Sequence, residues 1–218
     1  MIDLFQFRNY SIDMGKAAAK KLQKEKALLN AAFSLFLKNG IRNTSISDIT
    51  EKAGVAKGTF YLYFKDKYDI RDQIVASKAA DIFTNAYKDM KKSKVLDAAV
   101  EEQVLFLLEN SMDQLSANQK LMHFIATNLE WRVLRKAFVK NEDKEEVNIV
   151  DAYHNILSRV EAKYRNVEIM LFMLFELTTT ACYNAAVYGS PVGLEELKPE
   201  LLHTLRAIMD SFLIIGNE

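Results

Sequence analysis

Apolar residues recur at helical spacing along most of the chain. Between residues 16 and 38 they share one side of an amphipathic helix, with lysines between them. These apolar positions are Leu22, Leu29, Ala32, Phe33 and Phe36. Asn39 and Gly40 follow as a C-cap signal, so the first helix is expected to end there.

A second helix is expected after Ser45, because Ser45 and Asp48 have the spacing of a capping box. Gly54 is expected to end this short helix. A third helix is predicted over residues 55–64 and a fourth over residues 68–90. The fourth has an apolar side formed by Ile70, Ile74, Ala79, Ile82, Phe83 and Ala86.

The same pattern predicts further helices in the second half of the chain. Their ranges are 95–114, 117–140, 144–163, 167–188 and 194–214, with a break near Asn128 left open. Start signals are Ser116-x-x-Gln119, Asp143-x-x-Glu146 and Pro191, and Gly189 is an end signal. No strand-like alternation or internal repeat rises above noise, so the predicted fold class is all-α.

Composition agrees with a helical protein. The 218 residues include two prolines and seven glycines, which argues against an all-β fold with many tight turns. Cys182 is the single cysteine, so an intrachain disulfide and a cysteine metal cage are both excluded.

The formal net charge of zero hides two unlike segments. Residues 1–78 contain 14 Lys and Arg against 8 Asp and Glu, a balance of +6, and residues 79–218 have a balance of −6. A basic N-terminal third is typical of a small nucleic-acid-binding module joined to another domain.

The chain is expected to carry no secretory or membrane-spanning segment. Asp3 stands where a secretory signal needs positive charge. The most apolar run covers residues 169–175 and is well short of the roughly 20 apolar residues of a spanning helix. We therefore expect a cytoplasmic protein without a membrane partner. Residues 1–15 are expected to form an N-terminal arm, with Met14 as an alternative natural start.

Residues 41–67 carry the most informative pattern: a short capped helix, a tight turn and a second short helix. The turn begins with Gly54, which is free to adopt a positive φ, as the helix-turn-helix motif characteristically needs. The residues expected to pack the two helices together are Ile46, Ile49, Ala53 and Val55.

The side chains left facing outward have the chemistry of a DNA contact surface. They are Lys57, Thr59, Tyr61 and Tyr63. Lys and Tyr donate hydrogen bonds to phosphate oxygens, and a helix N-terminus adds free N–H groups and a positive dipole end. Gly58 permits a close approach of the backbone to DNA.

Residues 44–67 read TSISDITEKAGVAKGTFYLYFKDK and resemble the signature of the tetracycline-repressor (TetR) family of bacterial transcriptional regulators nearly throughout. The specific features are Ala-Gly-Val, Lys-Gly-Thr, the aromatic cluster and Phe-Lys-x-Lys at fixed offsets. The resemblance covers about residues 20–75, and beyond them it extends only to length and helix count.

The resemblance implies an N-terminal three-helix DNA-binding domain and a C-terminal helical bundle, with about nine helices in all. We assign them residues 16–75 and 76–218. It also implies a homodimer through the last two helices and a ligand cavity in the C-terminal domain. By position, it implies DNA contacts by Lys57, Gly58, Thr59, Tyr61 and Tyr63, and phosphate contacts by Ser45 and Lys67.

Ordinary structural roles remain open for several of these residues. Phe60 and Phe64 are expected to lie in the core, and Tyr61 is the better DNA candidate among the aromatic residues. Leu62 departs from the polar or aromatic residue often found there; it either contacts a thymine methyl group or packs internally. The lysines of the first helix either solvate its surface or reach phosphate: Lys16, Lys20, Lys21, Lys24 and Lys26.

Dimerisation is also expected on physical grounds, because two DNA-binding domains on one duplex add their binding free energies. Half-sites would lie about 34–36 Å apart. Residues 169–175 are apolar around the whole helix and must be covered on every side. The last helix has a second apolar stripe: Leu197, Leu201, Leu205, Ile208, Met209 and Phe212. The alternative is a helix central to a monomeric bundle.

Candidate cavity residues mix aromatic, methionine and polar side chains, the composition of an adaptable apolar pocket. They are Met122, Phe124, Trp131, Tyr153, Phe172, Phe175, Glu176, Thr179 and Tyr183, and each can equally be ordinary core. Glu176 would be costly to bury unpaired. It can meet a cationic or hydroxylated ligand, pair with Arg132 or Arg135, or lie exposed.

An enzyme is not expected, and neither a cofactor nor a metal is expected. The three histidines lie far apart, and no nucleophile elbow or phosphate-binding glycine loop is present. The acidic run Glu142-Asp143-x-Glu145-Glu146 has the pattern of a solvated helix start.

The sequence favours a repressor that binds a palindromic operator on double-stranded DNA and is released by a small hydrophobic or cationic effector. The alternative is a TetR-like DNA-binding protein controlled by a protein partner or by no ligand.

Overall fold

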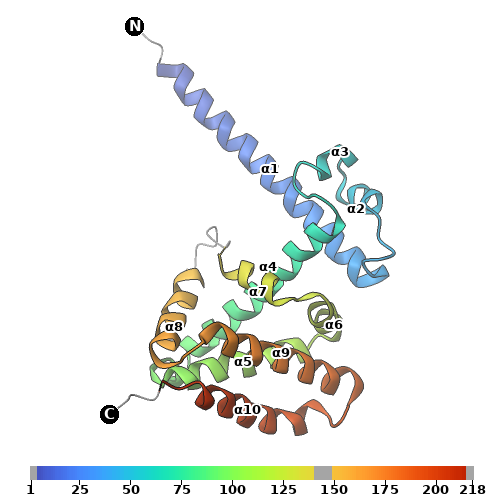
Figure 1. The fold of residues 1–218 in the computed structure, drawn as a ribbon. Helices are drawn as coiled ribbons and strands as arrows, with labels where there is room; N and C mark the ends of the chain where they lie inside the picture. Colours follow the sequence, from blue (N-terminus) through green and yellow to red (C-terminus); the bar gives the residue numbers. More distant parts are fainter. Residues whose placement is uncertain (1–3, 140–148, 215–218) are drawn as a thin grey trace. The chain divides into compact units, whose positions relative to one another are not determined.

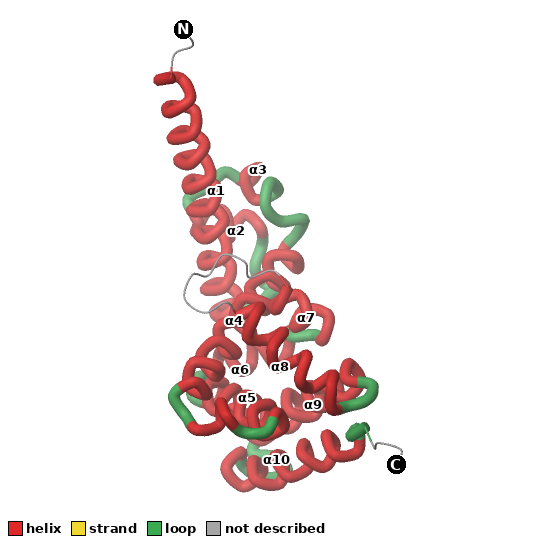
Figure 2. Tube along the Cα trace, turned by 90° about the vertical axis from the view of Figure 1, so that its left-hand side faces the viewer, coloured by secondary structure: helices red, strands yellow, loops and turns green. Residues whose placement is uncertain are grey.

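A computed structural model describes residues 4–139 and 149–214, which are helices joined by short loops (Figure 2). No strand occurs in these ranges, where an isolated bridge pairs Tyr164 with Leu213. The all-α prediction is confirmed. Internal contacts divide the chain into two compact units, Met1–Ile74 and Val75–Glu218. The domain boundary expected after residue 75 lies one residue from this division.

The first unit contains α1 (Leu4–Asn39), α2 (Ile46–Ala53), α3 (Lys57–Phe60) and the start of α4 (Lys67–Lys91). The prediction for the first helix was wrong at its start: α1 begins at Leu4, so residues 4–15 continue the helix instead of forming a separate arm. No proline interrupts this stretch, and a single interior Gly15 costs a helix only about 1 kcal/mol. Figure 1 shows the N-terminal part of α1 extending beyond α2 and α3.

Both ends of α2 are formed by the residues that the sequence indicated. The Asp48 backbone N–H donates to Ser45 Oγ at 3.1 Å, and the Ser45 N–H donates back to Asp48 Oδ2 at 2.8 Å. Gly54 has a φ of 67°, and its N–H donates to the carbonyls at the end of α2. The capping box and the glycine C-cap are therefore confirmed.

The helix α3 is shorter than the predicted range of 55–64, because residues 61–63 form turns. Leu62 and Tyr63 donate their N–H groups to the carbonyls three residues before them. Gly58 and Thr59 are weak helix formers, and Ala56 supplies no side-chain cap at the start. Only tertiary packing can hold so short a helix.

The core of the first unit joins all four helices. Its fully or almost fully buried side chains include Leu28, Ala32, Phe36, Ile49, Phe60, Phe64, Ile70 and Ile74. Ile49 is fully buried as predicted, whereas Ile46, Ala53 and Val55 are half-buried. Phe60 and Phe64 are core residues, as expected.

The second unit contains the rest of α4 and the elements that follow it. They are η1 (Lys94–Asp97), α5 (Val100–Ser116), α6 (Gln119–Asn128), α7 (Trp131–Val139), α8 (Ile149–Lys163), α9 (Val167–Tyr183), η2 (Asn184–Tyr188) and α10 (Leu194–Ser211). The described ranges thus hold ten α-helices instead of about nine. The difference arises because the predicted helix 117–140 is two helices, with the break near Asn128 that the sequence left open.

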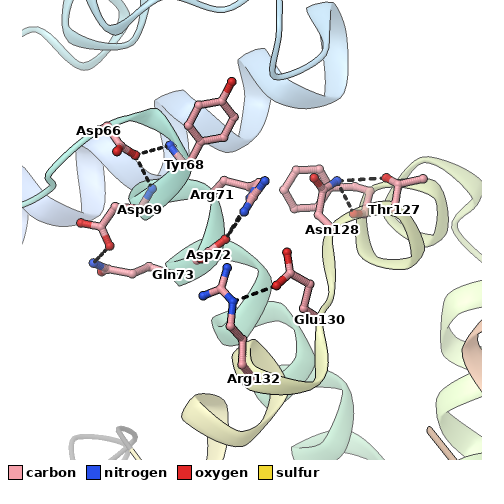
Figure 3. A network of polar contacts seen from close by, with 11 residues as sticks. Asp66, Tyr68, Asp69, Arg71, Asp72, Gln73, Thr127, Asn128, Glu130 and Arg132 are labelled. Atoms are coloured by element: carbon pink, nitrogen blue, oxygen red, sulfur yellow. Dashed lines mark hydrogen bonds and ion pairs between the residues drawn. The ribbon is translucent and has the colours of Figure 1, made fainter. Parts of the chain in front are cut away.

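Side-chain hydrogen bonds mark the break between α6 and α7 (Figure 3). Asn128 Nδ2 donates to the Phe124 carbonyl at 2.8 Å, and Arg132 pairs with Glu130 at 2.8 Å at the start of α7. The start signal at Ser116 was wrong. Asn118 caps α6 instead, accepting from the Leu121 N–H at 3.1 Å, because a neighbouring Asn is an equally good cap. The start signal at residues 143–146 lies outside the described residues.

The helices α9 and α10 lie side by side in Figure 1 and pack on each other. Every fourth residue of α9 is buried: Met170, Leu174, Thr178 and Cys182. Gly189 ends this segment with a φ of 60°, as predicted.

One helical segment of the described chain, Val167–Tyr188, is long and apolar enough to cross a membrane by length and composition alone. The apolar run of residues 169–175 lies within this segment. In the structure 28% of this segment is buried, and its α9 part packs against α6 and α10 within the second unit.

We expect Gly54→Ala to lower the free energy of unfolding by about 1 kcal/mol, because a Cβ disfavours the left-handed conformation at the end of α2. Urea denaturation measures the change. Gly58→Ala is the matched control, since Gly58 has no positive φ and open space around its Cα. Equal stability of the two variants would contradict the assignment.

Candidate nucleic-acid interface and effector cavity

The short helix α3 and the turn after it place buried and exposed residues at adjacent positions. Phe60 and Phe64 are at most 1% exposed, whereas Tyr61 is 55% and Leu62 is 78% exposed. Lys57 is also exposed, while Thr59 and Tyr63 are half-buried. The exposed side chains are therefore free to meet a partner, and Leu62 does not pack internally.

Aromatic packing holds Tyr61 at this surface. Its ring meets the Phe60 ring edge-on, with 5.5 Å between the centroids, and the Phe60 and Phe64 rings lie 5.4 Å apart. The tyrosine ring thus rests on the core at one side. More than half of the side chain stays accessible.

Gly58 is exposed, and nothing in its own fold requires a glycine there. Its φ is not positive, and a Cβ built on it would meet no atom within 4 Å. Alanine would also be the better helix former. A glycine that the fold does not need is consistent with an external surface approaching the backbone closely, as the sequence suggested.

Ser45 is exposed at the N-terminus of α2 and takes part in the capping box. Its hydroxyl oxygen accepts the Asp48 N–H, so its hydroxyl hydrogen remains available for a phosphate oxygen. The hydrogen bond from the Ser45 backbone N–H lowers the pKa of the Asp48 carboxyl, which keeps the cap ionised.

Lys67 has a structural role that the sequence did not reveal. Its ammonium group donates to the carbonyls of Ile41, Arg42 and Thr44, at 2.9, 3.0 and 3.2 Å. An ammonium group has three donors, so these contacts engage all of them. The predicted phosphate contact would require Lys67 to give up one of these bonds.

The start of α4 next to Lys67 is fixed by polar contacts (Figure 3). Asp66 Oδ1 accepts the backbone N–H groups of Tyr68 and Asp69 at 2.8 and 2.9 Å. Arg71 pairs with Asp72 and lies over the Tyr68 ring, 5.4 Å from its centroid. These contacts orient the exposed Tyr68 beside Lys67.

The lysines of α1 extend the basic surface of the first unit. Lys20, Lys21, Lys24 and Lys26 are exposed, and the side chain of Lys16 lies outside those that the structure describes.

The second unit encloses a cavity of about 240 Å³ between α4, α5, α6, α7, α8 and α9. Its lining is almost entirely apolar. Side chains that contribute to it include Ile82, Phe83, Leu107, Leu108, Met112, Ile125, Leu171 and Leu174. Ser111, Thr178, Thr179 and Cys182 add small polar groups. Burial raises the pKa of the Cys182 thiol to about 12, so this group stays protonated.

The cavity contains some of the residues that the sequence named and excludes others. Those that line it are Met122, Trp131, Phe175 and Thr179. Phe124 is buried elsewhere in the core, Phe172 is 42% exposed and Glu176 is exposed. The side chain of Tyr153 lies outside those described. Most of the lining was missed because single Leu, Ile and Val positions look the same whether they face a cavity or a filled core.

Tyr183 lies outside the cavity and joins α9 to α6 at the surface. Its hydroxyl is 2.8 Å from His123 Nδ1 and 3.4 Å from the Tyr188 hydroxyl. Arg135 pairs with Glu168 at 2.6 Å and not with Glu176, which removes one of the roles considered for Glu176. Within the described ranges, no group of three or more His, Cys, Asp or Glu side chains is placed to hold a metal ion.

Comparison with known proteins agrees with this arrangement. A family model described as bacterial regulatory proteins, tetR family, matches residues 28–74. The chain is 30% identical over 142 residues to the fatty acid metabolism regulator protein of Bacillus subtilis, covering 65% of this chain and 68% of that protein.

Solved structures with the same fold include two bound to acyl-CoA. FadR from Bacillus subtilis in complex with stearoyl-CoA has a TM-score of 0.54 at 24% identity, covering 83% of this chain and 96% of that chain. FadR from Thermus thermophilus, a TetR family transcriptional repressor in complex with lauroyl-CoA, has a TM-score of 0.54 at 18% identity, covering 88% and 97%.

We expect Lys67→Met to lower the free energy of unfolding by about 1–2 kcal/mol, because three carbonyl groups lose their donor. Lys57→Met removes an exposed lysine of the same unit and should change stability by less than about 0.5 kcal/mol. Chemical denaturation compares the two variants. If Lys67→Met is as stable as Lys57→Met, the carbonyl contacts do not hold the unit together.

Proposed function

The chain belongs to the TetR family of bacterial regulatory proteins, and we propose that it is a transcriptional repressor that binds a palindromic operator and is released by a small apolar effector. The observation that carries the DNA-binding part is the exposed surface of α3 next to the buried Phe60 and Phe64. The cavity of the second unit carries the effector part.

The DNA contacts that we propose come from α3, from the turn that follows it and from the N-cap of α2. Lys57, Thr59, Tyr61 and Tyr63 would donate to phosphate or bases, and Ser45 would donate to a phosphate at the start of α2. Gly58 would let the backbone approach the duplex. Lys67 would position the unit through its carbonyl contacts instead of binding phosphate itself.

A homodimer through α9 and α10 would supply the second DNA-binding domain that a palindromic operator needs. The side of α9 opposite its buried residues exposes Ile169, Phe172 and Met173 at 52, 42 and 46%. Large apolar side chains exposed together on one side of a helix are typical of a protein interface. A partner copy would cover these side chains, and sedimentation as a monomer at micromolar concentration would overturn this arrangement.

The effector that we propose is apolar, with a long alkyl or acyl chain as the leading class. The almost wholly apolar lining favours such a ligand. Relatives of the same fold were solved with stearoyl-CoA and lauroyl-CoA, which supports the acyl class. The cationic effector considered from the sequence is disfavoured, because the described lining includes no Asp or Glu.

The helix α4 is the element that we propose to carry the signal. Ala79, Ile82 and Phe83 of α4 line the cavity, and the same helix begins at Lys67, which holds the loop before α2. A ligand that displaces the cavity wall would therefore move a helix that is continuous with the DNA-binding unit. We propose a cytoplasmic location, where such a regulator meets its operator.

For DNA binding, we expect Lys57→Ala to weaken affinity at all sites and to lower the slope of log K against log salt by about one. Gly58→Ala should weaken binding about tenfold while leaving stability unchanged or slightly higher, because its Cβ meets only the DNA. The probe is DNA selected from a random pool by the wild-type protein. Unchanged affinity in both variants would refute the proposed interface.

For the effector, we expect lauroyl-CoA to raise the melting temperature of the wild-type protein and to release it from DNA. Saturation at about 100 times Kd stabilises a protein by about 2.7 kcal/mol. Ala126→Phe places a ring in the cavity wall and should abolish both effects. Thr127→Phe, exposed on the same helix, is the control. If no alkyl or acyl compound raises the melting temperature of the wild-type protein, control by a protein partner becomes the better hypothesis.

A further inference from the structure

The cavity has one charged residue among the described residues of its lining, Arg135 on α7. Its side chain is 60% exposed, so it stands where the cavity meets solvent. Trp131, one turn earlier on α7, also lines the cavity and packs against Phe172 and Phe175, with ring centroids 5.9 and 5.8 Å apart. Among the described residues, the mouth therefore combines an apolar wall with one cationic side chain.

Glu168 in the first turn of α9 is the present partner of Arg135. Arg135 Nη1 lies 2.6 Å from Glu168 Oε1, and the two side chains are 60 and 63% exposed. Glu168 does not belong to the lining. Exposed ion pairs contribute little to stability, so an anionic ligand can replace Glu168 in this pair at little cost to the fold. A guanidinium group also offers five N–H donors in a planar fork, which suits carboxylate and phosphate oxygens.

We propose that the cavity selects an amphiphile with an anionic head group, which Arg135 binds in exchange for Glu168. The alkyl chain would lie along the apolar wall, and the head would replace the glutamate at the mouth. Glu168 then acts as an internal competitor that sets the ligand concentration needed for binding. This inference rests on the proposed effector cavity and adds the chemistry of the head group.

Two sources share this chemistry: the carboxylate of a free fatty acid and the phosphates of an acyl-CoA. Both are anions that a guanidinium group binds through paired hydrogen bonds. A long-chain alcohol has the same tail without the charge. Dodecanoate, lauroyl-CoA and dodecanol therefore separate the contribution of the head group from that of the chain.

The test measures the affinity of full-length protein for these three compounds by calorimetry. We expect Arg135→Gln to weaken the binding of dodecanoate, of lauroyl-CoA or of both at least tenfold and to leave dodecanol binding unchanged. Arg132→Gln is the matched control, because Arg132 lies on the same helix and is absent from the lining. Glu168→Gln should strengthen anion binding about threefold, and this gain should vanish in the double variant with Arg135→Gln.

The outcomes separate this inference from the broader proposal. If dodecanol binds and Arg135→Gln leaves both anions unaffected, the role of Arg135 is refuted while the effector cavity stands. If none of the three compounds binds, both proposals fail. A loss confined to dodecanoate supports the carboxylate as the source of the head group, and a loss confined to lauroyl-CoA supports the phosphates.

Discussion

The burial of Phe60 and Phe64 is the interaction on which the proposed DNA-binding surface around α3 depends. Phe60 is the last residue of α3, a helix only four residues long and too short to be stable by its own hydrogen bonds, and Phe64 follows the turn after it. Two aromatic rings inserted in the core one turn apart determine its orientation. Because the Phe60 and Phe64 side chains are buried in the core, the other side of this segment faces solvent. The exposed residues there are Lys57, Gly58 and Tyr61.

A similar division operates along α9 in the second unit. One side contributes Leu174, Thr178 and Cys182 to the cavity wall, while Ile169, Phe172 and Met173 on other sides remain exposed. A helix that is apolar all round must find cover on every side. In this fold the cavity, α10 and a proposed second copy divide that task, and the membrane-like hydropathy of the segment follows from it.

The chemistry of the two units differs as their charges do. The first unit exposes lysines on α1 and α3, and exposed lysines suit a polyanion whose contacts are mainly to phosphate. The second encloses an apolar space, and Arg135 is the one charged residue among the described residues that line it. The helix α4 contributes residues to both units.

The sequence by itself determined the helical class, the capping box at Ser45 and the cap at Gly54, because each depends on residues within a few positions, whereas it left the break near Asn128 open. Only the tertiary structure decided what Lys67 and the cavity residues contact. The carbonyls bound by Lys67 lie 23 to 26 residues away. Phe172 and Phe175 are alike in sequence, yet only Phe175 lines the cavity. The reason is that each residue turns the helix by about 100°, and the packing of other helices decides which direction faces the space.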